Sequence, residues 1–261
     1  MNIVVCIKQV PDTDDIKIDP ETNTLIREGV ESIINPYDLH ALETALSLKD
    51  RLGGTVTVIS MGPGQVKKSL KKTIALGADH TVLLSDRGFA GADTLATSYT
   101  LACGIKELPE SDLIICGKQA IDGDTAQVGP GIAEHLQIPH ITYVKEIMEA
   151  NEHQLTVKRE TETGYDVIKM ELPGVITTLM EINEPRLPSI RGILRSRKTE
   201  IPVWGIDDIT IQKEFIGLDG SPTQVVKVDT PDLQAEGEIY EGEPENQVEQ
   251  LIKELNDRQI L

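Results

Sequence analysis

One polar loop carries the side chains and glycines best suited to hold a phosphate group. It follows Leu113–Cys116, an apolar run typical of a buried strand, and it leads into a stretch with helical spacing. In open α/β sheets, ligands collect where strands end, and the amino terminus of a helix offers free N–H groups to an anion. Thr125 and Gln127 add neutral donors. The loop reads Gly117-Lys118-Gln119-Ala120-Ile121-Asp122-Gly123-Asp124-Thr125-Ala126-Gln127-Val128-Gly129-Pro130.

Residue types alone leave the ligand of this loop open. Asp122 and Asp124 would repel phosphate directly, so we expect them to cap the helix or to bond to ribose hydroxyls or backbone amides. Gly123 lets a ligand approach the backbone. Neither a GxxxxGK[ST] phosphate loop nor a GxGxxG turn is present, and a polar connection that binds nothing is the alternative. A weaker second candidate, also after a strand, is Met61-Gly62-Pro63-Gly64.

Strand and helix patterns alternate through the first half of the chain. Short runs rich in β-branched residues predict strands, and apolar residues at helical spacing predict helices between them. Repeated β-then-α order predicts an α/β fold with a doubly wound, mostly parallel, Rossmann-like sheet. The expected strands are 3–7, 55–60, 80–84 and 113–116, and the expected helices are about 37–52, 66–76 and 93–105, with a fourth after the polar loop.

The pattern changes after Pro139. Turn-forming residues at 151–153 and 162–164 separate runs that predict an antiparallel β-ribbon over about 140–180, ending in a buried run from Val175 to Met180. No period is sustained from 183 to 244, which is typical of a binding arm or of disorder. A last amphipathic helix, 247–259, is too short to be stable alone in water. We therefore expect an α/β domain at 1–182, a separate segment at 183–205, and a C-terminal arm at 206–261 whose helix packs on a partner.

Composition narrows the class of function. The chain has 261 residues and a net charge of −18, from 25 basic and 43 acidic residues, which argues against binding to nucleic acid or to an anionic membrane surface. Cys6, Cys103 and Cys116 lack CxxC spacing and predict buried thiols in a reducing cytoplasm. No apolar run approaches the ~20 residues that a membrane-spanning helix needs.

Several ordered segments resemble the beta subunits of electron-transfer flavoproteins. The opening Cys6-Ile7-Lys8-Gln9-Val10-Pro11-Asp12 is similar to the start of that family. So are Ile34-Asn35-Pro36-Tyr37-Asp38, Met61-Gly62-Pro63, Ala75-Leu76-Gly77-Ala78-Asp79, and Asn183-Glu184-Pro185-Arg186 followed by Ile190-Arg191-Gly192-Ile193. Residues 117–129 resemble the family's adenine-nucleotide signature. The likeness extends over about residues 1–205, and the tail matches loosely.

The resemblance implies a heterodimer with an alpha subunit that holds one FAD, and a second nucleotide in this chain. It places Cys6 and Met61 against the adenine, and the ribose and phosphates within residues 117–128. The residues that it implies for the nucleotide site are Cys6, Lys8, Asn35, Pro36, Tyr37, Asp38, Met61, Gly62, Gly117, Lys118, Gln119, Asp122, Gly123, Asp124, Thr125, Ala126, Gln127, Val128 and Gly129. It implies no metal site and no side-chain acid or base.

The interior of the loop favours FAD over AMP as that second nucleotide. AMP-binding members tend to carry Asp or Asn where this chain has Gly123, and GQM after the threonine. A glycine there leaves room for a pyrophosphate that continues toward a flavin. The expected function is NADH-driven electron bifurcation, in which one electron goes to a partner flavin-dependent dehydrogenase, acyl-CoA or 2-hydroxy-acid, and the other to ferredoxin or flavodoxin. The alternative is a conventional beta subunit with structural AMP.

A second implied site docks the dehydrogenase. Residues 187–198 are expected to form a docking loop in which basic and apolar side chains alternate, with a solvated charge run as the alternative. Many relatives have an aromatic residue at Leu187 and a denser lysine run at Lys198-Thr199-Glu200, so this chain departs from the family there. The expected docking residues are Arg186, Ile190, Arg191, Ile193 and Arg195.

Two other classes share parts of the pattern. A free-standing nucleotide-binding module of the universal-stress type would share the sheet and the loop, but not the ribbon, the segment 183–205 or the tail. An adenylating enzyme would carry an SGGxDS loop after its first strand, which this chain lacks. A yellow flavin spectrum of the purified protein would separate the flavoprotein from both.

Overall fold

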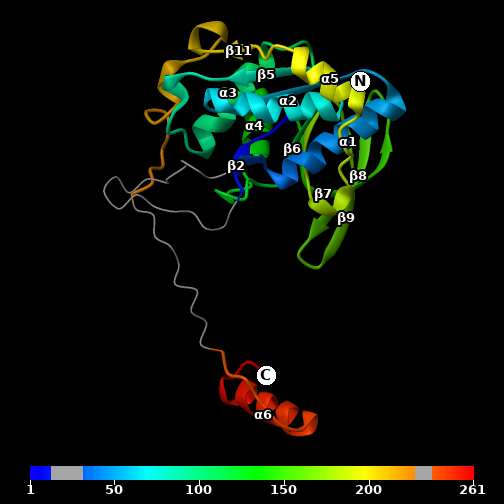
Figure 1. The fold of residues 1–261 in the computed structure, drawn as a ribbon, viewed down its shortest axis with the longest axis vertical. Coiled ribbons are helices and arrows are strands. Elements are labelled where there is room, and N and C mark those ends of the chain that lie inside the picture. Colours follow the sequence, from blue (N-terminus) through cyan, green and yellow to red (C-terminus); the bar gives the residue numbers. More distant parts are fainter. Residues whose placement is uncertain (13–31, 227–236) are drawn as a thin grey trace. The chain divides into compact units, whose positions relative to one another are not determined.

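The computed structural model describes residues 1–12, 32–226 and 237–261. The chain divides into two compact units, Met1–Lys227 and Val228–Leu261. The first contains the sheet and its helices (Figure 1). The predicted α/β class and parallel sheet are confirmed. A nine-stranded sheet has the order β11-β5-β4-β1-β6-β10-β7-β8-β9, and its neighbours from β11 to β7 pair in parallel.

The strands of the first unit match the apolar runs of the sequence. The strands of the large sheet are β1 (Asn2–Cys6), β4 (Thr55–Met61), β5 (His80–Leu84), β6 (Leu113–Gly117), β7 (His140–Ala150), β8 (Gln154–Thr161), β9 (Gly164–Glu171), β10 (Gly174–Thr178) and β11 (Val203–Trp204). A separate antiparallel hairpin, β2 (Gln9–Pro11) with β3 (Ser32–Ile34), was not predicted. Strand β10 ends at Thr178, before the expected Met180, which lies in a single 3-10 turn.

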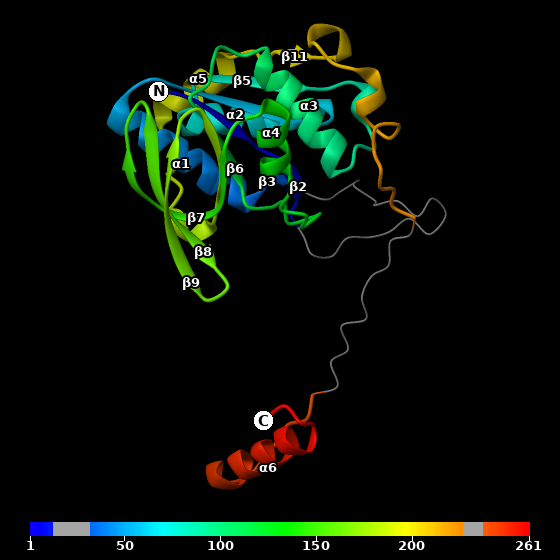
Figure 2. The same cartoon turned by 180° about the vertical axis from the view of Figure 1, so that it is seen from behind.

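Helices cover both faces of the sheet, as the doubly wound prediction requires. They are α1 (Pro36–Leu52), α2 (Lys67–Leu76), α3 (Thr94–Lys106), α4 (Val128–Leu136) and α5 (Ile190–Lys198). Alternate residues of β1 point to opposite faces: Ile3 and Val5 pack with α1 and α2, whereas Val4 and Cys6 pack with α3 and α4. Figure 1 and the view from behind in Figure 2 show the two helical layers.

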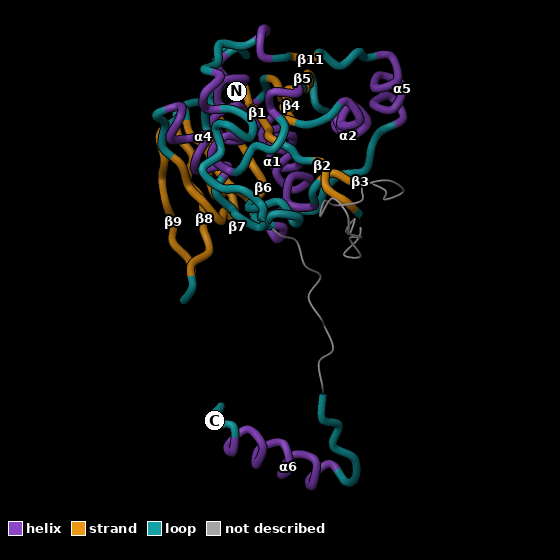
Figure 3. Tube along the Cα trace, turned by 90° about the vertical axis from the view of Figure 1, so that its left-hand side faces the viewer, coloured by secondary structure: helices purple, strands orange, loops and turns teal. Residues whose placement is uncertain are grey.

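The predicted ribbon is the end of the main sheet. Strands β7, β8 and β9 pair antiparallel in sequence, and β7 also pairs in parallel with β10. Figure 3 shows these three strands side by side at one edge of the fold. Residue Tyr143 has φ 58°, at the bulge where β7 changes register against β10. The ribbon therefore shares the core of the α/β domain.

The segment after 183 is more regular than its sequence pattern indicates. Ser189 caps α5 by accepting a hydrogen bond from the N–H of Gly192, and β11 adds an edge strand to β5. Residues up to 226 also pack on this unit, because Ile209 and Ile216 are buried and Ser221 accepts a hydrogen bond from the N–H of Asp93 at 2.8 Å. The first unit thus continues past the expected boundary at 205.

The second unit contains α6 (Pro244–Asp257), which begins three residues before the expected start at 247. Its apolar side chains are exposed within the unit: Val248 by 54%, Leu251 by 45% and Ile252 by 47%. In the described part of the chain, no helix is both long enough and apolar enough to cross a membrane.

Candidate functional site

The candidate site lies where the central parallel strands end. The chain passes from β1 through α1 to β4 on one side of β1, and returns after β5 to form β6 on the other side. Such a reversal opens a crevice between the two neighbouring strands at their carboxyl ends. Cys6 and Cys116 face each other in register at this point. The loop between β6 and α4 (117–127), called here the β6–α4 loop, leaves the sheet beside them.

The paired cysteines are structural. Both are buried, in the core that faces α3 and α4. A hydrogen bond with Cys6, together with burial, raises the pKa of the Cys116 thiol well above its ordinary value. The Cys116 thiol therefore stays neutral.

Asp38 joins the ends of β1 and β6. Its carboxylate is buried and accepts hydrogen bonds from the backbone N–H of Lys8 at 2.7 Å and from that of Gly117 at 3.2 Å. Burial raises its pKa to about 7, although these hydrogen bonds oppose the shift. A Cβ at Gly117 would overlap the Asp38 carboxylate and Tyr37, so only glycine lets the loop leave the strand this close to α1.

Asn35 holds the next part of the loop. Its side-chain amide, fully buried, donates to the carbonyl of Gln119 at 2.8 Å and accepts from the N–H of Ile121 at 3.2 Å. Its own backbone N–H donates to the Lys8 carbonyl at 2.9 Å. The residues that precede and open α1 therefore fix the path of the β6–α4 loop. Pro36 is the first residue of that helix, and Tyr37 is half-buried beside Gly117.

The two loop aspartates do not cap α4, contrary to one of the roles expected for them. Asp122 forms an ion pair with Lys8 at 2.5 Å, and Asp124 accepts a hydrogen bond from the Gln119 amide at 2.6 Å. The N-cap position is Gln127, whose side chain makes no capping bond. Both carboxylates thus have partners within the site, which reduces their repulsion toward a bound phosphate.

The loop backbone adopts conformations that L-residues rarely take. Asp124 has φ 49° and Ala126 has φ 55°. The left-handed region costs a non-glycine residue about 1–2 kcal/mol. Such strain persists where the surrounding structure imposes it, and it gathers at functional sites. Gly123, in contrast, borders open space, because a Cβ placed there would meet no atom within 4 Å.

Helix amino termini point toward this loop. The first turn of α4 leaves the N–H groups of Val128 and Gly129 without intrahelical acceptors, and Pro130 has no N–H to leave unsatisfied. Thr125 accepts a hydrogen bond from Thr94, the first residue of α3, at 3.1 Å. Gly129 is buried, and a Cβ on it would approach Thr177 of β10 to 2.5 Å. This arrangement suits an anion at the loop.

The remaining predicted site residues border the same edge. Met61 ends β4 and packs on the core layer that contains Cys6. Gly62 donates its N–H to the Leu84 carbonyl at 3.0 Å, which closes the turn after β4. Lys118 lies over the ring of Tyr143 at 5.4 Å. The structure thus gathers the residues from β1, α1, β4 and the β6–α4 loop at one edge.

The docking segment, defined here as residues 187–198, is mainly helical rather than the expected loop. Arg195 donates to the carbonyls of Ile74 and Ala78, which anchors α5 to the end of α2. Gly192 lies against the Ala75 carbonyl, where a Cβ would not fit. Leu187, Ile190 and Leu194 are exposed by 88%, 80% and 53%. Arg191 is exposed as well, and Ile193 is exposed by 36%.

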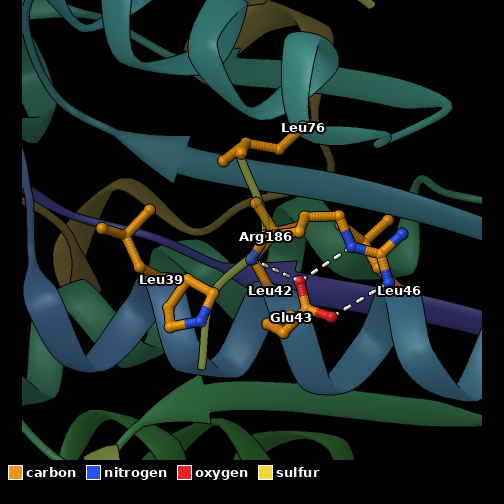
Figure 4. Close-up of a pocket in the computed structure, with 7 residues that line it drawn as sticks. Leu39, Leu42, Glu43, Leu46, Leu76 and Arg186 are labelled. Atoms are coloured by element: carbon orange, nitrogen blue, oxygen red, sulfur yellow. Dashed lines mark hydrogen bonds and ion pairs between the residues drawn. The ribbon is translucent and has the colours of Figure 1, made fainter. Parts of the chain in front are cut away.

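Arg186 holds the start of this segment on α1. Its guanidinium contacts both oxygens of Glu43, at 2.8 and 2.9 Å (Figure 4). It also donates to Asp50 at 2.9 Å. Burial alone would raise the pKa of Glu43, but hydrogen bonds from Arg186 and Ser47 outweigh it and lower the pKa. The pairing of Arg186 with Glu43 was not predicted, and neither were the hydrogen bonds that Asn183 donates to His40 and Thr44, because no sequence pattern links α1 to residue 183.

Comparison with known proteins agrees with the family resemblance of the sequence segments. The family described as "Electron transfer flavoprotein domain" matches residues 22–209. The electron transfer flavoprotein subunit beta of Thermoanaerobacterium thermosaccharolyticum is 49% identical over 262 residues, and that of Clostridium acetobutylicum is 49% identical over 261, with 100% of both chains covered in each case. The caffeyl-CoA reductase-Etf complex subunit CarD of Acetobacterium woodii is 48% identical over 263 residues, again with 100% of both chains covered. The chain belongs to the electron transfer flavoprotein family, among its beta subunits.

Proposed function

We propose that this chain binds FAD at the β6–α4 loop and, paired with an alpha subunit, takes part in NADH-driven electron bifurcation. The observation that carries the proposal is the open space around Gly123, in a loop whose charges and donors are otherwise fixed. That space leaves room for the second phosphate of a dinucleotide. The name of the Acetobacterium relative, a subunit of a reductase-Etf complex, supports a role within a larger redox assembly.

The loop residues divide into those that hold the nucleotide and those that hold the loop. The free N–H groups of Val128 and Gly129, with Thr125 and Gln127, would bind the phosphates. Asn35 and Asp38 fix the loop, and Lys8 balances the charge of Asp122. By the family resemblance, Cys6 and Met61 would border the adenine. When bound, FAD supplies hydride acceptance from NADH and one-electron transfer, which no side chain provides.

The docking segment and α6 supply the contacts with other proteins. Leu187, Ile190 and Leu194 expose apolar surface on a segment that is anchored by Arg186 before α5 and by Arg195 within it. This surface would receive the flavin-dependent dehydrogenase. The apolar face of α6 would pack on the alpha subunit, and ferredoxin or flavodoxin would take the other electron. Exposed apolar side chains of this kind mark interaction surfaces when they are contiguous.

Flavin quantification on the co-purified heterodimer tests the proposal. The expected result is two FAD per pair, with NADH reducing both. One FAD per pair together with AMP would overturn bifurcation and leave a conventional beta subunit. A colourless pair without nucleotide would remove the nucleotide site as well.

A further inference from the structure

A groove between α2 and α5 shares only Pro36 with the residues predicted for the nucleotide site. It has a volume of about 560 Å³, and its apolar lining includes Ile34, Leu39, Leu76 and Ile193. Helices α2 and α5 lie side by side in Figures 1 and 3. The volume is in the range of pockets that bury a ligand or several side chains. Such an apolar groove on a protein surface calls for an occupant.

The rim of the groove is basic on an acidic chain. Lys68, Lys71 and Lys72 of α2 line it, and Lys67 precedes them on the same helix. Lys67 and Lys71, like Lys68 and Lys72, stand four residues apart, so each pair repels along the helix surface. No carboxylate among residues 1–12, 32–226 and 237–261 forms an ion pair with these lysines. Their mutual repulsion destabilises α2, and no ion pair within the described residues compensates for it.

The groove is continuous with the docking segment. Ile193 of α5 lines it, while Ile190 and Leu194 of the same helix expose apolar surface beyond it. A partner that lies on α5 therefore reaches the lysines of α2 as well. We propose that the α2–α5 groove receives an apolar side chain flanked by carboxylates from the flavin-dependent dehydrogenase. The inference rests on the proposed function, because it assigns a second contact to the same partner.

A matched pair of charge reversals tests the groove. Lys72→Glu acts on the rim, and Lys169→Glu makes the same charge change on the exposed face of β9. Each variant is co-purified with the alpha subunit and assayed for reduction of an acyl-CoA dehydrogenase that the wild-type pair reduces. We expect Lys72→Glu to raise KM for the dehydrogenase about tenfold at low salt with kcat little changed, because like charges at an interface oppose association. Lys169→Glu should leave KM within about twofold.

The variant Ile190→Ala shows whether a negative result concerns only the groove or the docking of the dehydrogenase on α5 as a whole. If Ile190→Ala raises KM but Lys72→Glu behaves like Lys169→Glu, the dehydrogenase docks on α5 and the groove is not part of the contact. If neither Ile190→Ala nor Lys72→Glu changes KM, the docking role of α5 fails and the inference fails with it.

Carbodiimide cross-linking identifies the occupant directly. The reagent joins lysine to carboxylate at contact, and peptide mapping shows which chains are joined. Cross-links from Lys68, Lys71 or Lys72 to the dehydrogenase are the expected result. Cross-links confined to this chain, to a second copy of it, or to the alpha subunit would overturn the assignment.

Discussion

The carboxylate of Asp38 accepts a hydrogen bond from the N–H of Gly117 at 3.2 Å, across the start of the crevice. Its second oxygen accepts from Lys8 at 2.7 Å, so one buried side chain links the chain just after β1 to the end of β6. The geometry of the candidate nucleotide site therefore depends on a group whose pKa is raised to about 7.

Asp38→Asn tests this dependence through pH. Burial raises the folded pKa of Asp38 from 3.8 to about 7, so between these values the folded state binds a proton that the unfolded state has lost. Stability then falls as pH rises through this window, by about 4 kcal/mol for this group. The asparagine does not titrate, although it leaves one buried N–H without an acceptor, at a cost of about 1–3 kcal/mol. Relative to wild type, the variant should gain stability from pH 4 to pH 7.

Urea unfolding of the heterodimer at fixed concentration across that range measures the difference. A difference between variant and wild type that stays constant with pH would show that Asp38 titrates normally. Glu43 offers a control of opposite sign, because its lowered pKa makes stability fall toward acid.

Gly123→Asp tests the space that distinguishes FAD from AMP. A side chain at this position meets no atom of the protein, so the free energy of unfolding should change by less than about 0.5 kcal/mol. The added carboxylate would occupy the space proposed for a second phosphate and repel it. We expect flavin in the co-purified pair to fall from two per heterodimer to one. Gly123→Ala, which adds no charge, should retain more flavin, and two flavins in Gly123→Asp would contradict the proposal.

The strands of the central sheet could be predicted from the sequence because their apolar residues indicate that they are buried. Strands β1, β4, β5 and β6 are short apolar runs rich in β-branched residues and are buried between two layers of helices. Helix α5 escaped prediction for the opposite reason. Of its residues only Ser196 is buried, and it is held by a serine cap and by arginine contacts rather than by an apolar stripe.

The predicted site residues lie at one edge of the sheet, but the contacts that they make there were not predicted. The resemblance brings together Asn35, Asp38 and the loop, whereas residue types left Asp122 and Asp124 either to cap the helix or to bond to ribose hydroxyls or backbone amides. Lys8, 114 residues away, pairs with Asp122 instead. Likewise, the sequence predicts that Arg186 belongs to the docking residues, whereas in the structure it forms an ion pair with Glu43 of α1. Tertiary partners decide what a charged side chain does, and residue spacing does not reveal them.

Glu43→Gln tests whether the Arg186 anchor positions the docking segment. Glu43 accepts two hydrogen bonds from the Arg186 guanidinium and one from the Arg186 backbone N–H. A hydrogen bond to a charged group contributes about 1.5–3 kcal/mol to stability. We expect the variant to lose about 2 kcal/mol of stability and to raise KM for the dehydrogenase. Asp50→Asn is the matched control: its side chain is 60% exposed, so the change should be below about 1 kcal/mol.

Equal effects of the two substitutions would show that the anchor is not Glu43. A stability loss without any change in KM would show that the segment keeps its position, or that the dehydrogenase binds elsewhere. The stabilising effect of Glu43 lies above its ordinary pKa of 4.5 and is lost as pH falls through its lowered folded value. The difference between Glu43→Gln and wild type should therefore narrow in acid.

Leu251→Asp and Gln250→Asp test α6 as the contact with the alpha subunit. Both variants add one negative charge to the same helix, but Leu251 lies on the face with Val248 and Ile252, whereas Gln250 lies on the opposite face. Burying an unpaired carboxylate in an apolar interface costs several kcal/mol, so Leu251→Asp should reduce co-purification with the alpha subunit at least tenfold. Gln250→Asp should co-purify like wild type. The first unit has its own core, so the thermal midpoint of the isolated chain should be unchanged in both. Equal recovery of the alpha subunit with both variants would exclude the apolar face of α6 from the interface.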